Sequence, residues 1–93
     1  MDTILPGDLI RAARALLGWS QEKLASESGI TTKSLRDIEL GTRRPTSKTS
    51  GQIRQALEAA KIQFIAANDD GSEIVGAGVR WKPDRPNMTI KII

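Results

Sequence analysis

Apolar side chains recur at helical spacing along the first sixty residues, in four segments that glycine or proline separates. In the first segment they stand at i, i+1, i+4, i+7 and i+8, which places them on one stripe of a helix. Pro6 suits the first position of a helix, and Gly18 suits the residue after its end. The pattern predicts a helix over residues 6–17. Its buried stripe consists of Leu9, Ile10, Ala13, Leu16 and Leu17.

Two shorter segments follow, and each has a capping residue at its start and a glycine at its end. Ser20 is a suitable N-cap for a helix that ends at Gly29. Thr31 takes the same place before a second helix, which ends at Gly41. The sequence therefore predicts two short helices joined by a tight turn. The side chains expected to face inward are Leu24, Ala25, Ile30, Leu35 and Ile38.

The helical pattern continues in one more segment after Pro45 and then gives way to alternation. Thr46 or Ser47 is expected to cap a fourth helix that runs to about Ala60. Residues 61–67 alternate in part, residues 73–81 are rich in β-branched side chains, and residues 88–93 alternate again. The fold class predicted is mainly α with a small β appendage. A domain of four to five helices over residues 1–60 precedes a β extension over residues 61–93, which forms an antiparallel hairpin or three short strands.

The composition excludes several kinds of chemistry. The chain of 93 residues contains no cysteine and no histidine. Disulfides, thiolate metal sites, the usual zinc ligands and the commonest general base are therefore excluded. The glycines at Gly76 and Gly78 form too short a motif for nucleotide binding. We expect no enzyme activity, no cofactor and no metal.

The ends and the interior of the chain show no signal for export or for membrane insertion. Residues 1–10 include acids and lack a basic leader, and no stretch approaches the roughly 20 apolar residues of a membrane span. A chain without cysteine also suits a reducing compartment. We expect a cytoplasmic protein with no membrane partner.

Positive charge is concentrated in the middle of the chain. The net charge is +3, but residues 33–54 alone contain six basic and two acidic side chains. Such an excess suggests a polyanionic partner, although an ordinary solvated helix surface would have the same charge. Arg11, Lys48 and Arg54 are candidates both for phosphate contacts and for solvated surface.

The two short helices and the arginine-rich segment after them carry a family resemblance. Residues 20–45 contain Ser-Gln, Leu-Ala, Gly-Ile-Thr, Leu-x-x-Ile-Glu and Gly-x-Arg-x-Pro in register. Over residues 5–60 the chain resembles the Cro/phage-repressor (Xre-like) family of small bacterial helix-turn-helix regulators. The resemblance implies a lambda-repressor-like domain whose second short helix enters the major groove of double-stranded DNA.

The resemblance also implies which residues meet DNA. They are Gln21, Thr31, Thr32, Lys33, Ser34, Arg36, Asp37, Thr42, Arg43 and Arg44. Short hydroxyl side chains allow a helix to lie close to the bases, and Lys33 is the expected reader of guanine O6 or N7. Asp37 could accept a hydrogen bond from cytosine N4, or face solvent and reduce non-specific binding.

A glutamate in the last turn of a helix is disfavoured by the helix dipole unless a cation pairs with it. Glu39 lies at such a position. In the family an arginine of the first helix pairs with this glutamate, and Arg14 stands at the matching place. The resemblance therefore implies an ion pair that connects the first and third helices. Two separately solvated charges are the alternative.

The function predicted is that of a sequence-specific DNA-binding transcriptional regulator, with a repressor favoured, located at the nucleoid. One domain makes few base contacts, so a homodimer on an inverted-repeat operator is expected. Met88, Ile90 and Ile92 are the candidate dimer interface, through pairing with the same strand of a second copy. That strand could instead pack on its own helices. The alternative function is a protein-binding module, an antitoxin or anti-activator, that engages a partner protein through the β tail.

Overall fold

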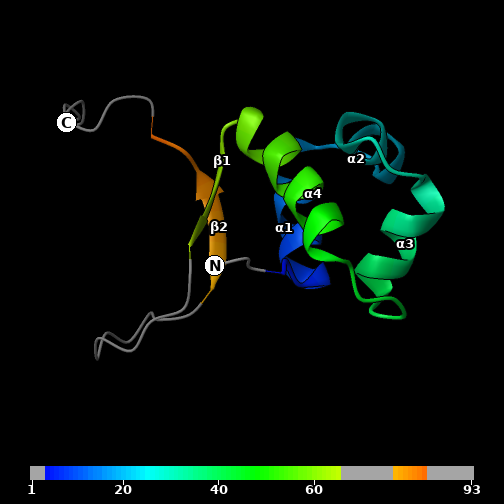
Figure 1. Ribbon diagram of the computed structural model, residues 1–93. Helices are drawn as coiled ribbons and strands as arrows, with labels where there is room; N and C mark the ends of the chain where they lie inside the picture. The colour runs from blue at the N-terminus through cyan, green and yellow to red at the C-terminus, as the bar shows by residue number, and fades with distance from the viewer. Residues whose placement is uncertain (1–3, 66–76, 84–93) are drawn as a thin grey trace, which may run out of the picture.

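The computed structural model describes residues 4–65 and 77–83 of the chain. In this part, four helices are followed by two strands (Figure 1). The elements are α1 (Gly7–Leu17), α2 (Gln21–Ser28), α3 (Thr32–Leu40), α4 (Ser47–Ala59), β1 (Ile62–Ile65) and β2 (Gly78–Trp81). The predicted fold class, mainly helical with a small antiparallel β element, is confirmed. The third strand predicted at residues 88–93 lies outside the described residues.

Hydroxyl side chains start three of the four helices. Ser20, Thr31 and Thr46 each accept a hydrogen bond from the backbone N–H three residues further on, at 3.0 to 3.1 Å. Caps of this kind stabilise a helix by about 1 kcal/mol each. Thr46, of the two candidates, is therefore the cap of α4. The start of α1 differs from the prediction, because Pro6 has an extended backbone (ψ 153°) and is the N-cap, so that the helix begins at Gly7.

One hydrophobic core joins all the helices to the first strand. Its residues are less than 4% exposed and come from the N-terminal segment, from all four helices and from β1. The helices α2 and α4 pack together, as do α2 and α3, and α1 packs on α3. The buried apolar residues are Leu5, Ile10, Ala13, Leu24, Ala25, Leu35, Ile38, Ile53, Leu57 and Ile62.

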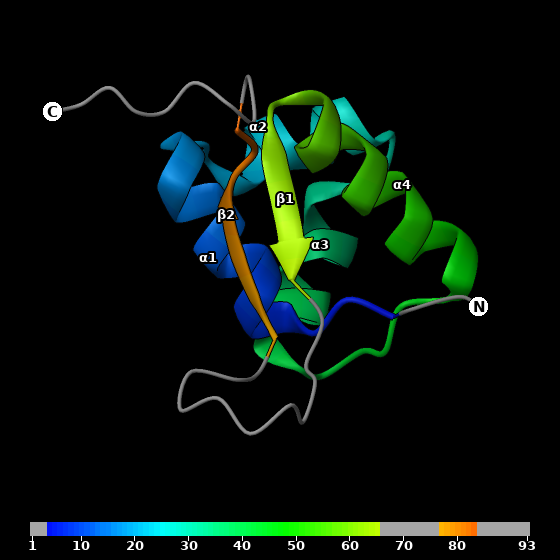
Figure 2. The same cartoon turned by 90° about the vertical axis from the view of Figure 1, so that its left-hand side faces the viewer.

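The two strands form an antiparallel sheet that lies across α1 and α4 (Figure 2). Ile62 pairs with Trp81 and Phe64 with Val79, so these four side chains share one face of the sheet. Ile62 is buried, and Phe64 and Val79 pack against the core. The described part of residues 61–93 therefore shares the core of the helical part.

The beginning of α1 lies directly against the end of α3. A Cβ atom at Gly7 would stand 2.7 Å from the carbonyl oxygen of Ile38 and 2.8 Å from that of Glu39. Only glycine allows this approach of two backbones without a shift. The contact fixes the end of α3 relative to α1.

None of the helices in the described ranges is long and apolar enough to cross a membrane.

Candidate nucleic-acid interface

A tight turn sets the angle between α2 and α3. Gly29 has a left-handed backbone (φ +76°), and the N–H of Ile30 donates to the carbonyl oxygen of Ala25 at 3.0 Å. Glycine adopts this conformation without the steric cost of a Cβ atom. Ala25 is buried and small, which allows the two helices to approach closely. The sequence thus builds a compact helix-turn-helix unit from α2 and α3.

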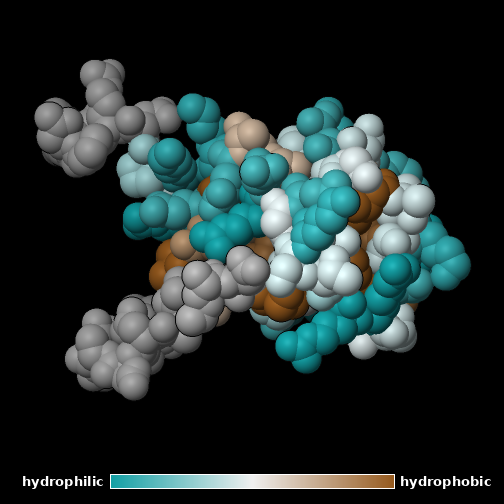
Figure 3. Space-filling view, in the orientation of Figure 1, coloured by the Kyte–Doolittle hydropathy of each residue, from teal (hydrophilic) through white to brown (hydrophobic). Residues whose placement is uncertain are grey.

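The outward residues of α3 lie at the end of the molecule opposite the sheet (Figure 1). We call the group formed by Thr31, Thr32, Lys33, Ser34, Arg36 and Asp37 the α3 surface. Its side chains are exposed or half-buried, and none of them belongs to the hydrophobic core. Hydrophilic and intermediate side chains cover most of this end of the molecule (Figure 3). The arrangement presents hydrogen-bonding groups to a partner.

Two oppositely charged side chains of the α3 surface form an ion pair. Lys33 Nζ lies 3.1 Å from Asp37 Oδ2, one helical turn away. The Lys33 side chain is 79% exposed and the Asp37 side chain is 27% exposed. Asp37 therefore lies against the helix while remaining in contact with solvent, and its carboxylate neutralises part of the charge of Lys33.

The loop after α3 folds back onto this helix. The backbone N–H and the hydroxyl of Thr42 both donate to the carbonyl oxygen of Asp37, at 3.0 and 3.2 Å. Arg43 Nη1 donates to Ser34 Oγ at 3.1 Å, across nine residues of sequence. The loop thereby adds Arg43 to the edge of the α3 surface.

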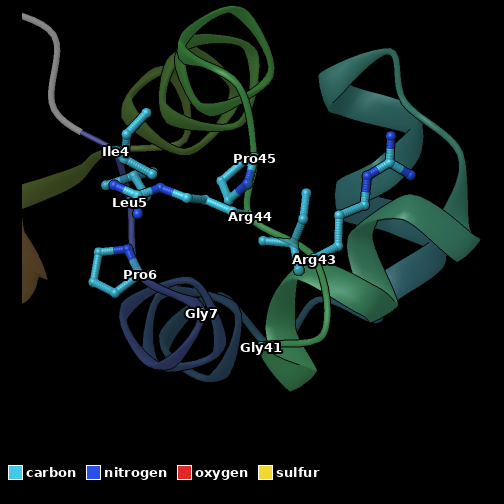
Figure 4. A pocket seen from close by; sticks show the side chains of 9 residues that line it. Ile4, Leu5, Pro6, Gly7, Gly41, Arg43, Arg44 and Pro45 are labelled. Carbon is cyan, nitrogen blue, oxygen red and sulfur yellow. The ribbon is translucent and has the colours of Figure 1, made fainter.

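The neighbouring Arg44 extends in the opposite direction. It lines a pocket of about 340 Å³ between the N-terminal segment and the end of α3. Figure 4 shows its side chain reaching toward Ile4 and Leu5, whereas Arg43 points toward α3. Of the two arginines, only Arg43 is brought to the α3 surface. The pocket is lined by Ile4, Leu5, Pro6, Gly7, Ile38, Gly41, Arg43, Arg44 and Pro45.

Behind the α3 surface, the carboxylate of Glu39 is buried and fully paired. Arg14 Nε donates to Glu39 Oε2 and Arg14 Nη2 to Oε1, both at 2.8 Å, and the Glu39 side chain is only 2% exposed. Two parallel bonds of this kind hold both groups in one plane. The hydrogen bond to Glu39 is the main cause of a raised pKa at Arg14. Burial opposes that rise, and the charges of Glu39 and Glu22 add to it.

Two further residues reach Glu39 and were not connected with it by the sequence. Gln21 Nε2 donates to Glu39 Oε1 at 3.1 Å. Arg11 donates through Nη1 to the backbone carbonyl of Glu39, so one of its donors faces inward and not toward a phosphate. Because these partners are 18 and 28 residues away in sequence, no local pattern could have identified them. Glu39 thus links α1, the start of α2 and the end of α3.

Arg54, considered above as a phosphate contact or as solvated surface, has structural partners on α4 and β1. Its Nε lies 2.8 Å from Glu58 Oε2, and its guanidinium carbon lies 5.6 Å from the centre of the Phe64 ring. The candidate dimer residues Met88, Ile90 and Ile92 lie outside the described residues.

The short capped helices, their tight turn and the polar surface of the second helix together define a DNA-binding helix-turn-helix protein. The family model for helix-turn-helix proteins of the Cro/C1 type matches residues 10–63, from α1 into β1. This match covers more than half of the 93 residues. The chain therefore belongs to the Cro/C1-type, Xre-like family of DNA-binding transcription regulators. No curated protein matches the chain closely.

Proposed function

We propose that the protein is a transcriptional repressor that binds an inverted-repeat operator as a homodimer and inserts α3 into the major groove. The observation that carries this proposal is the α3 surface. It combines hydroxyl groups with Lys33 and Arg36 on α3, at the end of the molecule opposite the sheet. A protein acting in this way is expected at the nucleoid.

The start of α2 supplies a contact to the DNA backbone in this proposal. The amide nitrogen of Gln21 carries two hydrogens, and Glu39 accepts one of them. The second hydrogen can donate to a phosphate oxygen. Backbone amides at the start of a helix favour the same negative charge. The Arg14–Glu39 pair thus orients a phosphate contact as well as fixing α3.

Residues of the loop after α3 supply further phosphate contacts. Arg43 is exposed and held beside α3 by Ser34, and Thr42 is exposed at the helix end. Arg44 is exposed on the other side of the loop, where it can reach a phosphate only by turning away from the N-terminal segment. We therefore expect Arg43 to contribute more to binding than Arg44.

A homodimer follows from the demand for specificity. A single α3 reaches only a few base pairs, whereas two copies read half-sites about 34–36 Å apart on one face of the duplex. The β extension over residues 61–93 is the candidate interface. In its described part, Ile65 and Trp81 are 40% and 49% exposed. Pairing of Met88, Ile90 and Ile92 with a second copy would complete the interface.

The experiment is in-vitro selection from a random duplex library at near-physiological salt. The wild type should enrich an inverted repeat, and Thr32→Ala combined with Lys33→Ala should lose the enrichment. Lys23→Ala is the matched control, because it removes the same charge from an exposed lysine of another i,i+4 ion pair, outside the α3 surface and the β extension. Retention that falls steeply with salt and enriches no sequence would show phosphate attraction alone and contradict the proposal.

A second candidate function is a protein-binding module, such as an antitoxin or anti-activator. The half-exposed Trp81 and Ile65 favour it, because apolar side chains at the edge of a small sheet suit strand addition by a partner. Hydrophobic side chains also reach the surface near the sheet (Figure 3). This candidate predicts that substitutions on the sheet, and not those on the α3 surface, abolish activity in the cell.

A further inference from the structure

The ion pair on the α3 surface places a hydrogen-bond donor beside an acceptor. Lys33 Nζ and Asp37 Oδ2 are 3.1 Å apart. The other two ion pairs with i,i+4 spacing in the described ranges, Lys23–Glu27 and Arg54–Glu58, belong to α2 and α4. Of these three pairs, only the first lies on the helix that the proposed function places in the major groove.

The acceptor residue of this pair has an anchored backbone and a largely covered side chain, whereas the donor extends into solvent. The backbone carbonyl of Asp37 accepts hydrogen bonds from Thr42 and Arg43, which close the end of α3. The Asp37 side chain is mostly covered, while Lys33 is 79% exposed. An ammonium has three donor hydrogens, so Lys33 can keep its bond to Asp37 and still donate twice elsewhere.

The edge of a G·C base pair offers the complementary pattern. Guanine presents N7 and O6 as acceptors, and cytosine presents N4 as a donor next to O6. O6 and N4 hydrogen-bond to each other and are therefore about 2.9 Å apart. The separation of the Lys33 and Asp37 atoms is similar, at 3.1 Å. Lys33 Nζ can thus donate to guanine O6 while Asp37 Oδ2 accepts from cytosine N4.

We propose that Lys33 and Asp37 read one G·C base pair per half-site as a unit. Lys33 donates to guanine O6 and N7, and Asp37 accepts from cytosine N4. This inference rests on the proposed function and names the base pair that its recognition helix selects.

An A·T pair fits the unit less well. Its central donor, adenine N6, lies between two acceptors, adenine N7 and thymine O4. A carboxylate that accepts from N6 would face an acceptor oxygen or nitrogen on each side. In the G·C pair, N4 has an acceptor on one side only, and Lys33 covers that acceptor.

The carboxylate also directs Lys33 away from the DNA backbone. A free ammonium is attracted to every phosphate, which increases binding to all sequences equally. Asp37 repels phosphate and compensates part of the Lys33 charge. The pair therefore contributes most binding free energy where a base edge forms hydrogen bonds with both groups. Asp37 is therefore a specificity-determining residue in this proposal.

The test compares the base preferences of the full chain with those of Lys33→Ala, Asp37→Ala and the double variant, all selected from the same duplex library. Glu58→Ala is the matched control, because it removes a carboxylate from another i,i+4 pair outside α2 and α3. Alanine favours helix, so all variants should fold, and their circular dichroism checks this.

We expect the wild type to prefer G·C at one position of each half-site by roughly tenfold or more. Each single variant should lose that preference, and the double variant should lose no more than either, because the two groups act as a unit. Asp37→Ala should bind random DNA at least as tightly as the wild type, whereas Lys33→Ala should bind all sequences more weakly. The control should keep the wild-type preference.

Two results would overturn the inference alone. In the first, Asp37→Ala keeps the base preferences of the wild type at every position of the operator. In the second, the variants lose a preference for A·T and not one for G·C. Failure of the wild type to enrich any operator would instead overturn the proposed function, and this inference with it.

Discussion

At the scale of single residues, the carboxylate of Glu39 connects α1, the start of α2 and the end of α3. It is almost fully buried, and its oxygens accept from Arg14 and Gln21. A buried carboxylate is tolerated only where donors replace the lost water. The pKa of Arg14 is raised, so its stabilising charge is complete below the ordinary arginine pKa and is lost only as pH rises through the higher folded-state value.

The first prediction concerns the loss of this partner. Arg14→Met should lower the free energy of unfolding by about 3 kcal/mol, because it leaves the Glu39 charge buried without its cation. Urea denaturation followed by circular dichroism measures the change. Arg36→Met removes an exposed arginine from α3 and should shift stability by no more than about 0.5 kcal/mol. If the two substitutions lowered the free energy of unfolding equally, the buried charge of Glu39 would not require its ion pair with Arg14.

At the scale of whole elements, contacts with α1 and α2 determine the position of α3. Its packing on α1 and α2 buries Leu35 and Ile38, while its exposed side chains are polar except for Leu40, the last residue of the helix. Gly7, at the start of α1, lies directly against the last turn of α3. The helix α3 is thus supported along its inner side and at its C-terminal end, and its first turn remains accessible.

The second prediction tests the contact between α1 and α3. Gly7→Ala should destabilise the protein by about 1–3 kcal/mol, although alanine favours helix, because the new methyl would overlap two backbone carbonyls of α3. Gly51→Ala, within α4, should stabilise it by about 0.5–1 kcal/mol, since nothing lies within 4 Å of the added atom. The midpoints of urea unfolding distinguish the two. Stabilisation by both substitutions would contradict the close approach.

The whole molecule has two different ends, one with the α3 surface and one with the sheet (Figure 1). The first end carries hydroxyl groups with Lys33 and Arg36, and the second carries the half-exposed Ile65 and Trp81 beside exposed basic residues. The two ends would allow the protein to contact DNA at one and a second copy at the other. Dimerisation would then leave both recognition helices accessible.

The third prediction tests the dimer in the full chain. Ile90→Lys combined with Ile92→Lys should convert the dimer to a monomer in sedimentation velocity and weaken operator binding by tenfold or more, on the order of the gain from a second half-site. Thr89→Lys adds a charge at the alternate position of the predicted strand and should leave the dimer intact. A wild type that sediments as a monomer at micromolar concentration would contradict this interface.

The helices and their limits could be predicted because their causes are local. Ser20 and Thr31 cap helices through the next three residues, and Gly29 and Gly41 end them through their own backbone conformation. Apolar spacing identified most of the inner residues of α1 to α4 for the same reason, but it was wrong for Leu16, which is 39% exposed. The start of α1 was misplaced by one residue, because proline fits both the N-cap and the first helical position.

The contacts around the proposed site depend on residues far apart in sequence. The approach of Gly7 to Ile38 and the bond from Gln21 to Glu39 exist only after α1, α2 and α3 have packed. The bond from Arg43 to Ser34 forms only when the loop after α3 folds back onto the helix. Residue types alone could not separate Arg43, which turns toward α3, from Arg44, which turns away. Spacing and capping chemistry specify the elements, whereas the burial of a shared core specifies which side chains meet.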